Sequence, residues 1–227
     1  MLNEIEIPSS VTEFGRSLFC DCSSLTEISI PSSVTEIVGT FSSCSSLTKI
    51  KIPSSVEKID EWAFSGCSSL MQVTFELPSS LKIIGKYSFS QCSKLKQIEI
   101  PSSVTEIGSA SFFKCSSLSR VLLYSSTIKI DEEAFQECCP NLTIKMIPSS
   151  EIIINENAFK SCSSVKIKAN LSSNFSHLFI EEIKEQLIKH PQIEGRKRAV
   201  LFTSGSFCPI QKCHLKLLDI ASNVLSN

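Results

Sequence analysis

Apolar residues recur along this chain with a period of about 23 residues, which is typical of a repeat architecture. Seven cysteines mark the period, spaced by 22, 23, 25, 23, 23 and 24 residues: Cys22, Cys44, Cys67, Cys92, Cys115, Cys138 and Cys162. A phenylalanine stands three residues before each one: Phe19, Phe41, Phe64, Phe89, Phe112, Phe135 and Phe159. A leucine or valine usually follows at the same distance, although Cys139 and Pro140 shift it to Leu142 in one copy. Residues 1–168 are therefore predicted to form seven copies of one unit.

Each unit carries two apolar sets that suggest two different local structures. After Leu25, the residues Ile28 and Ile30 alternate with polar ones, as a half-buried strand requires. A proline then ends the strand in most copies, because it has no N–H to donate to a ladder: Pro8, Pro31, Pro53, Pro78, Pro101 and Pro148. A second set, such as Val34 and Ile37, precedes the next phenylalanine. We expect a parallel strand ladder on one side and turns or short helices on the other.

One such unit is too small to fold alone, because its few apolar side chains do not offset the conformational entropy lost on ordering it. Stacked units share a core and pair their strands, so the chain is predicted to be a solenoid. The repeated pattern of IPSSVTEI, Phe-x-x-Cys and CSSLT resembles the BspA-like leucine-rich repeats of surface and adhesion proteins. The resemblance implies a leucine-rich-repeat fold. It implies protein or matrix binding only in general terms, because one fold hosts many functions.

The cysteine ladder can be interpreted as core or as a metal or redox site, and the core interpretation is favoured. Cysteine is among the most buried residue types and packs as a small hydrophobe. No C-x-x-C pair occurs, and the close pairs Cys20/Cys22 and Cys138/Cys139 lack zinc-site spacing. The odd total of eleven cysteines, without a signal peptide, favours free thiols over disulfides. We predict no metal site.

The outward residues of the predicted strands are the candidate binding site. They run from acidic to basic along the chain: Glu27, Lys49, Lys51, Gln72, Gln97, Glu99 and Arg120. An extended solenoid surface suits a protein or glycan partner, which the sequence does not identify. An ordinary solvated face would show the same alternation, so that interpretation stays open. The formal net charge of −1 argues against a nucleic-acid partner.

The start of the chain, MLNEIEIPSS, lacks the basic and apolar regions of a secretory signal. No apolar run approaches the ~20 residues that span a bilayer. As written, the chain is expected to be soluble and cytoplasmic. The family resemblance implies a cell-surface location instead.

The repeat pattern stops after Lys168. Ser176 is a candidate N-cap for a helix that runs to about Lys189 and is ended by Pro191. Residues 169–198, this helix and a basic linker, are expected to cap the last coil. Residues 199–227 follow the pattern of a buried strand, a small-residue loop and an amphipathic helix, the opening of a Rossmann-like unit. The predicted fold is an α/β repeat: a leucine-rich-repeat solenoid with a C-terminal helix and a truncated Rossmann-like strand–loop–helix.

The segment GSFCPIQKCHL resembles the fingerprint GSFNPxTxxHL of nicotinamide mononucleotide adenylyltransferases. The resemblance implies that His214 stabilises charge while AMP passes from ATP to nicotinamide mononucleotide (NMN), with magnesium bound. It also implies three residues whose backbone approaches the nucleotide phosphates: Gly205, Ser206 and Phe207.

Two departures weaken the catalytic interpretation. Cys208 replaces the family's asparagine and Gln211 replaces its threonine. One strand and one helix cannot form an active site or fold alone. We therefore favour a binding solenoid that is not an enzyme and needs no cofactor, with a truncated or fused adenylyltransferase as the alternative.

Overall fold

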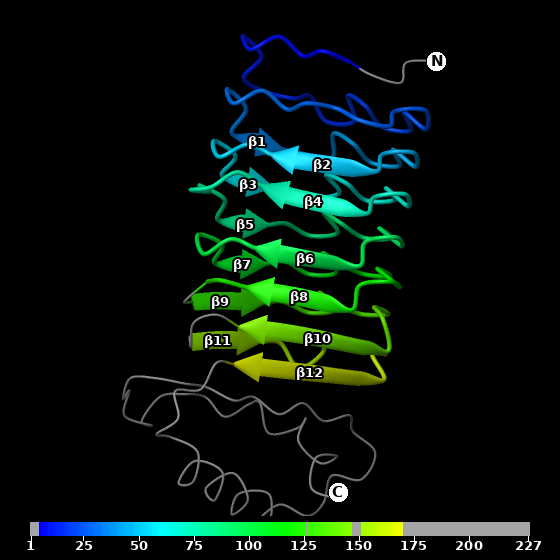
Figure 1. Ribbon diagram of the computed structural model, residues 1–227, viewed down its shortest axis with the longest axis vertical. Coiled ribbons are helices and arrows are strands. Elements are labelled where there is room, and N and C mark those ends of the chain that lie inside the picture. The colour runs from blue at the N-terminus through cyan, green and yellow to red at the C-terminus, as the bar shows by residue number, and fades with distance from the viewer. Residues whose placement is uncertain (1–4, 126, 147–150, 170–227) are drawn as a thin grey trace, which may run out of the picture.

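The structure is a computed structural model that describes residues 5–125, 127–146 and 151–169. These residues form a stack of coils with strands on two sides (Figure 1), so the predicted solenoid is confirmed. The strands are β1 (Glu36–Ile37), β2 (Lys49–Ile52), β3 (Lys58–Ile59), β4 (Gln72–Phe75), β5 (Ile83–Ile84), β6 (Gln97–Ile100), β7 (Glu106–Ile107), β8 (Arg120–Leu123), β9 (Thr127–Ile130), β10 (Asn141–Met146), β11 (Glu151–Ile154) and β12 (Ser164–Ala169).

The strands form two rows, only one of which is continuous. The six-stranded sheet has the order β1-β3-β5-β7-β9-β11, and all its pairs are parallel. The other row is divided into a two-stranded sheet, β2-β4, and a four-stranded sheet, β12-β10-β8-β6. The sequence predicted the second row as a ladder but not its division. It also did not predict that the second apolar set forms a sheet.

The side of the coil that joins these two rows consists of turns. No residue within the described ranges is helical, so the turns that we expected are present and the short helices are not. The described part of the chain is thus all-β rather than α/β, because every coil closes through tight turns that leave no room for a helical segment. The predicted capping helix, residues 169–198, and the strand–loop–helix of residues 199–227 lie outside the described residues, apart from Ala169 at the end of β12.

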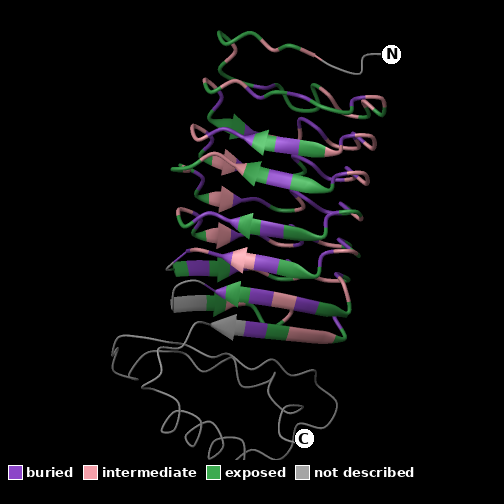
Figure 2. Cartoon of the chain, viewed as in Figure 1, coloured by how far each residue is buried: buried purple, intermediate pink, exposed green. Residues whose placement is uncertain are grey.

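The alternation of apolar and polar residues explains the strands. In β2, Ile50 and Ile52 are buried while Lys49 and Lys51 are exposed. Figure 2 shows the same alternation along the neighbouring strands. Successive side chains of a strand point to opposite faces, so a period of two places one set in the core and the other in solvent.

The division of the second row follows from a proline. The N–H of Glu76, which follows β4, donates to the Ile52 carbonyl at 2.9 Å, and that of Tyr124, which follows β8, donates to Ile100 at 3.1 Å. Both strands pair with the strand before them. At the same position after β6 stands Pro101, which has no N–H to donate, and β6 belongs to a different sheet from β4. Proline therefore ends a strand, as predicted, and also removes a bond to the preceding coil.

The core contains a stack of phenylalanine rings. Phe41, Phe64, Phe89, Phe112 and Phe135 are fully buried. Their rings are nearly parallel, with centroids 5.2–5.5 Å apart. This confirms the core interpretation of the repeated phenylalanines.

The cysteine beside each ring is also part of this core. The thiol of Cys67 donates to the Phe41 carbonyl of the preceding coil at 3.1 Å, and Cys115 donates to Phe89 at the same distance. Cysteine therefore fills a small apolar space and also provides a hydrogen-bond donor for a buried carbonyl. Burial raises the pKa of Cys44 to about 12, which keeps that thiol protonated at neutral pH.

The turns on the phenylalanine side place residues in the left-handed region of φ on both sides of the ring. Positive φ occurs at Gly39 and Gly66 and at eleven other positions: Ser17, Asp21, Ser43, Trp62, Tyr87, Gln91, Ala110, Lys114, Glu133, Glu137 and Ser161. Because residues with positive φ are interspersed among residues with negative φ in these turns, every second backbone N–H points toward the next coil. The N–H of Phe64 donates to Ser88 at 2.7 Å, and that of Gly66 donates to Ser90 at 2.8 Å. A ladder between coils thus forms here without a strand.

Candidate binding face

We call the outward surface of the divided row the strand face. It comprises the outward residues of β2, β4, β6, β8, β10 and β12, those of the preceding coil at residues 27–30, and the exposed Lys96 directly before β6. The structure places all seven predicted binding residues on this face with exposed side chains: Glu27, Lys49, Lys51, Gln72, Gln97, Glu99 and Arg120. The period-of-two pattern was sufficient to locate them.

Charges in the first half of the strand face are paired between coils. Lys49 lies 2.9 Å from Glu27, and Lys51 lies 2.6 Å from Glu76. Hydrogen bonds from Lys51 and from the Ser54 backbone N–H lower the pKa of Glu76. These exposed pairs contribute little to stability, because solvent screens them. Each pair offsets the charge of one of the lysines predicted for the binding face.

The second half of the face is different. Lys96, Arg120 and Lys145 are exposed, and none of them forms an ion pair with any residue that the structure describes. Glu99 is the one acidic residue among the outward residues of the described parts of β6, β8, β10 and β12. This half of the strand face therefore presents uncompensated positive charge.

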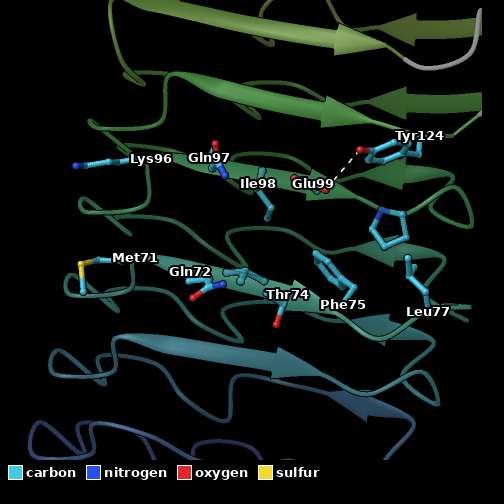
Figure 3. Close-up of a pocket in the computed structure, with 12 residues that line it drawn as sticks. Met71, Gln72, Thr74, Phe75, Leu77, Lys96, Gln97, Ile98, Glu99 and Tyr124 are labelled. Atoms are coloured by element: carbon cyan, nitrogen blue, oxygen red, sulfur yellow. Dashed lines mark hydrogen bonds between the residues drawn. The ribbon is translucent and has the colours of Figure 1, made fainter.

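A groove of about 610 Å³ lies between β4 and β6, where the two halves meet (Figure 3). At one end Phe75, Leu77, Pro101 and Tyr124 form what we call the apolar corner. Four polar residues of β4 and β6 line the groove: Gln72, Thr74, Gln97 and Glu99. Met71 and Lys96 lie at the other end. The groove therefore offers apolar, then polar, then cationic groups along its length.

A two-residue insertion creates the apolar corner. Phe75 pairs with Ile52 of the coil before it, and after this pair the chain has two more residues than the preceding coil before the next buried position, Leu81. The extra length places Leu77 at the surface, where 78% of it is exposed. Phe75 is only half-buried, whereas Ile52 is buried. The insertion corresponds to the 25-residue spacing between two of the repeated cysteines.

Tyr124 and Glu99 form the polar boundary of the apolar corner. The Tyr124 hydroxyl donates to a Glu99 carboxylate oxygen at 3.4 Å, a long hydrogen bond (Figure 3). Burial, and next the charge of Glu99, raises the pKa of Tyr124, so its hydroxyl stays protonated at neutral pH. This contact positions one carboxylate beside the apolar corner and away from Lys96.

The structure brings together only part of the predicted set. Gln72, Gln97 and Glu99 line the groove. Arg120 is next to Gln97 in the ladder. The predicted residues of the earlier coils, which include Lys49, lie outside the groove. Sequence reasoning missed other groove residues, among them Met71, Phe75, Leu77, Lys96 and Tyr124. The irregular repeat spacing was the available signal for the insertion.

The coils, the divided strand ladder and the exposed face define a leucine-rich-repeat solenoid. A model of the BspA type leucine-rich repeat region matches residues 1–93 and 38–166, in six copies. The chain belongs to the BspA-type leucine-rich-repeat family.

The solved structures that are similar to this chain include a leucine-rich-repeat protein and a vaccine antigen. A leucine-rich-repeat protein of T. pallidum is 25% identical, with a TM-score of 0.57, over 89% of this chain and 87% of that one. The pneumococcal vaccine antigen PcpA is 26% identical, with a TM-score of 0.50, over 60% of this chain and 36% of the antigen. No curated protein matches the chain.

The residues of the alternative, catalytic interpretation lie outside the described residues. They are Gly205, Ser206, Phe207 and His214. Across the described ranges, no helix is long and apolar enough to cross a membrane.

Proposed function

We propose that this protein is a binding module that holds a protein or glycan partner on its strand face. The observation that carries the proposal is the groove at the centre of that face, where polar, apolar and charged groups are exposed together. Binding sites are typically concave, with an apolar lining and a few placed polar groups. The likeness to a pneumococcal vaccine antigen supports a partner met at a cell surface.

The test of this function compares the two rows of strands. The face variant, Lys49→Glu with Lys145→Glu, reverses charges on the strand face outside the groove. The control, Lys82→Glu with Lys129→Glu, makes the same charge change on the side of the continuous sheet, directly before β5 and within β9. We expect the immobilised face variant to retain less protein or glycan from a cell-surface extract than the control does, because charges at the rim of a binding site govern encounter. Equal retention by both variants would place binding elsewhere.

A second candidate function rests on the sequence GSFCPIQKCHL alone. It is tested by incubating the 227-residue chain with ATP, NMN and magnesium and assaying for the dinucleotide. We expect no product, because the strands and second cationic cluster that such a site needs are missing from the segment. Product that disappears in His214→Ala would establish the adenylyltransferase.

A further inference from the structure

The groove between β4 and β6 has two chemically different ends. Figure 3 shows Met71 and Lys96 at one end and Leu77 with Tyr124 at the other. Lys96 immediately precedes β6 and Pro101 of the apolar corner immediately follows it, five positions later, which corresponds to roughly 16 Å of extended chain. A ligand that contacts both ends must therefore be extended.

The middle of the groove is suited to a peptide backbone. β4 and β6 are neighbours that do not pair, whereas the other neighbouring strands of this row do pair. Gln72 on β4 and Gln97 on β6 both line the groove, one from each of the two unpaired strands. Each side-chain amide can donate and accept a hydrogen bond, which are the two interactions that an extended peptide needs.

Charge specifies the ligand further. Lys96 is unpaired at one end, and Arg120, next to Gln97 in the ladder, is unpaired beside it in the described part of the chain. Glu99 lies at the opposite end, against Tyr124. An acidic group is attracted to the Lys96 end and repelled from the apolar corner. The ligand thus has a defined orientation.

We propose that the groove binds an extended peptide segment of a partner protein, with an acidic residue at the Lys96 end and a large apolar side chain in the apolar corner. A ~16 Å separation at ~3.3 Å per residue places these two anchors four or five residues apart. The inference deepens the proposed function, on which it rests. A neutral glycan is a different occupant, because it has no use for the unpaired cations.

The probe is an array of nonapeptides with a serine and glycine background. Each carries Glu, Lys or Ser at one position and Phe, Leu or Ser at a second, and the separation varies from one to seven residues. We expect the full chain to bind Glu-with-Phe and Glu-with-Leu peptides best at separations of four or five. Binding that ignores the acidic residue or the spacing, or no binding at all, overturns the inference. So does displacement of every peptide by maltohexaose.

Variants then assign the two anchors with the best peptide in solution. Leu77→Ser should weaken binding about tenfold, because the apolar contact is lost. Leu18→Ser is its control, because Leu18 is 54% exposed but lies on the phenylalanine side of the coil. This substitution should change binding by less than twofold. Lys96→Glu should invert the preference from Glu to Lys peptides, and Lys145→Glu on β10 should not.

These outcomes distinguish peptide binding in the groove from partner binding on the strand face as a whole. If the Lys49→Glu and Lys145→Glu face variant loses the macromolecular partner while the array shows no preference, the strand face binds but not through an anchored peptide. If the array preference is present and inverts in Lys96→Glu, the peptide site stands even where the partner itself tolerates the face variant. Unchanged thermal unfolding of each variant confirms that binding, not folding, was altered.

Discussion

The two rows of strands are built from the same coils, yet one is continuous and the other is divided. In the six-stranded sheet, β5 pairs with both β3 and β7, so the coil with the insertion is joined to both neighbours. On the strand face, β4 and β6 of the same two coils do not pair. The insertion and the proline therefore affect one side of a coil while the opposite side keeps its register.

This contrast shows how a repeat protein can vary its surface without losing its stack. The phenylalanine side also stays connected at this level, since the Phe64 N–H donates to Ser88. Two of the three sides hold the coils together, and the third is free to form a groove.

The largest effect should come from the core that both rows share. Phe89 is fully buried and stacks between Phe64 and Phe112. Phe89→Ala should lower the free energy of unfolding by about 3–5 kcal/mol, because it leaves a cavity. Urea unfolding measures the loss, with Phe113→Ala, at a half-buried position, as the milder control. A loss below about 1 kcal/mol would show that the stack is not a packed core.

The second test acts on the continuous sheet. A Cβ at Gly85 would lie 2.9 Å from the Ile59 carbonyl oxygen and 2.9 Å from the Asp60 carbonyl carbon, both of which are backbone atoms. Gly85→Ala should therefore destabilise by about 1–3 kcal/mol, as overpacking does. Gly15→Ala, where nothing lies within 4 Å, should be neutral in the same unfolding assay. Equal effects would mean that the coils on this side are not in close contact.

The third test creates a second division. Tyr124→Pro removes the N–H that donates to Ile100, at a position where other coils already carry proline. It should cost about 1 kcal/mol more than Tyr124→Ala, which removes the ring but keeps the N–H. Amide hydrogen exchange in β8 should become faster only in the proline variant. Unchanged exchange would refute the role assigned to Pro101.

Removing one buried hydroxyl should stabilise the protein slightly, in contrast to the destabilising substitutions above. The Ser88 hydroxyl is buried and has no hydrogen-bond partner in the described structure, and other coils have Ala63 or Ala134 at its place. Ser88→Ala should raise the free energy of unfolding by up to about 1 kcal/mol. Ser55→Ala is the contrast, because that hydroxyl donates to the Val34 carbonyl at 2.8 Å, and its loss should be destabilising.

The last predicted effect is a loss of stability at alkaline pH, which does not occur at neutral pH. Burial raises the pKa of Cys44 from 9.0 to about 12, and it also raises the pKa values of Cys67 and Cys92. A group with a raised folded-state pKa stabilises fully below its unfolded pKa and loses this contribution as pH rises toward the folded one. The free energy of unfolding measured with urea should therefore fall between pH 9 and 12. Cys44→Val should reduce this alkaline loss, and an unchanged slope would contradict the thiol ladder.

The sequence was sufficient for the parts of the fold that depend on a strict pattern. Phe-x-x-Cys and the alternating isoleucines locate the core because burial selects residue type at every coil. The left-handed turns were not predictable, since residues as different as Trp62, Tyr87 and Glu133 occupy them. There the hydrogen bonds between coils impose the backbone conformation, and residue preference does not reveal it.

The binding face was predictable residue by residue but not as a surface. Alternation predicted that Lys49 and Arg120 face outward. Whether each side chain forms an ion pair depends on which residues of the neighbouring coil lie beside it. Glu27 lies beside Lys49, whereas no acidic residue within the described ranges pairs with Arg120. The groove required knowing that an insertion and a proline act on the same strand pair.

The ladder on the phenylalanine side also gives the solenoid a direction. Its N–H groups, including those of Phe19, Phe64 and Phe135, all donate to carbonyls of the following coil. Aligned peptide groups add their dipoles, so this side has a negative pole toward the first coil and a positive pole toward the last. Any structure that covers the first pole must bring donors, and one that covers the other must bring acceptors. The same cap cannot serve both ends.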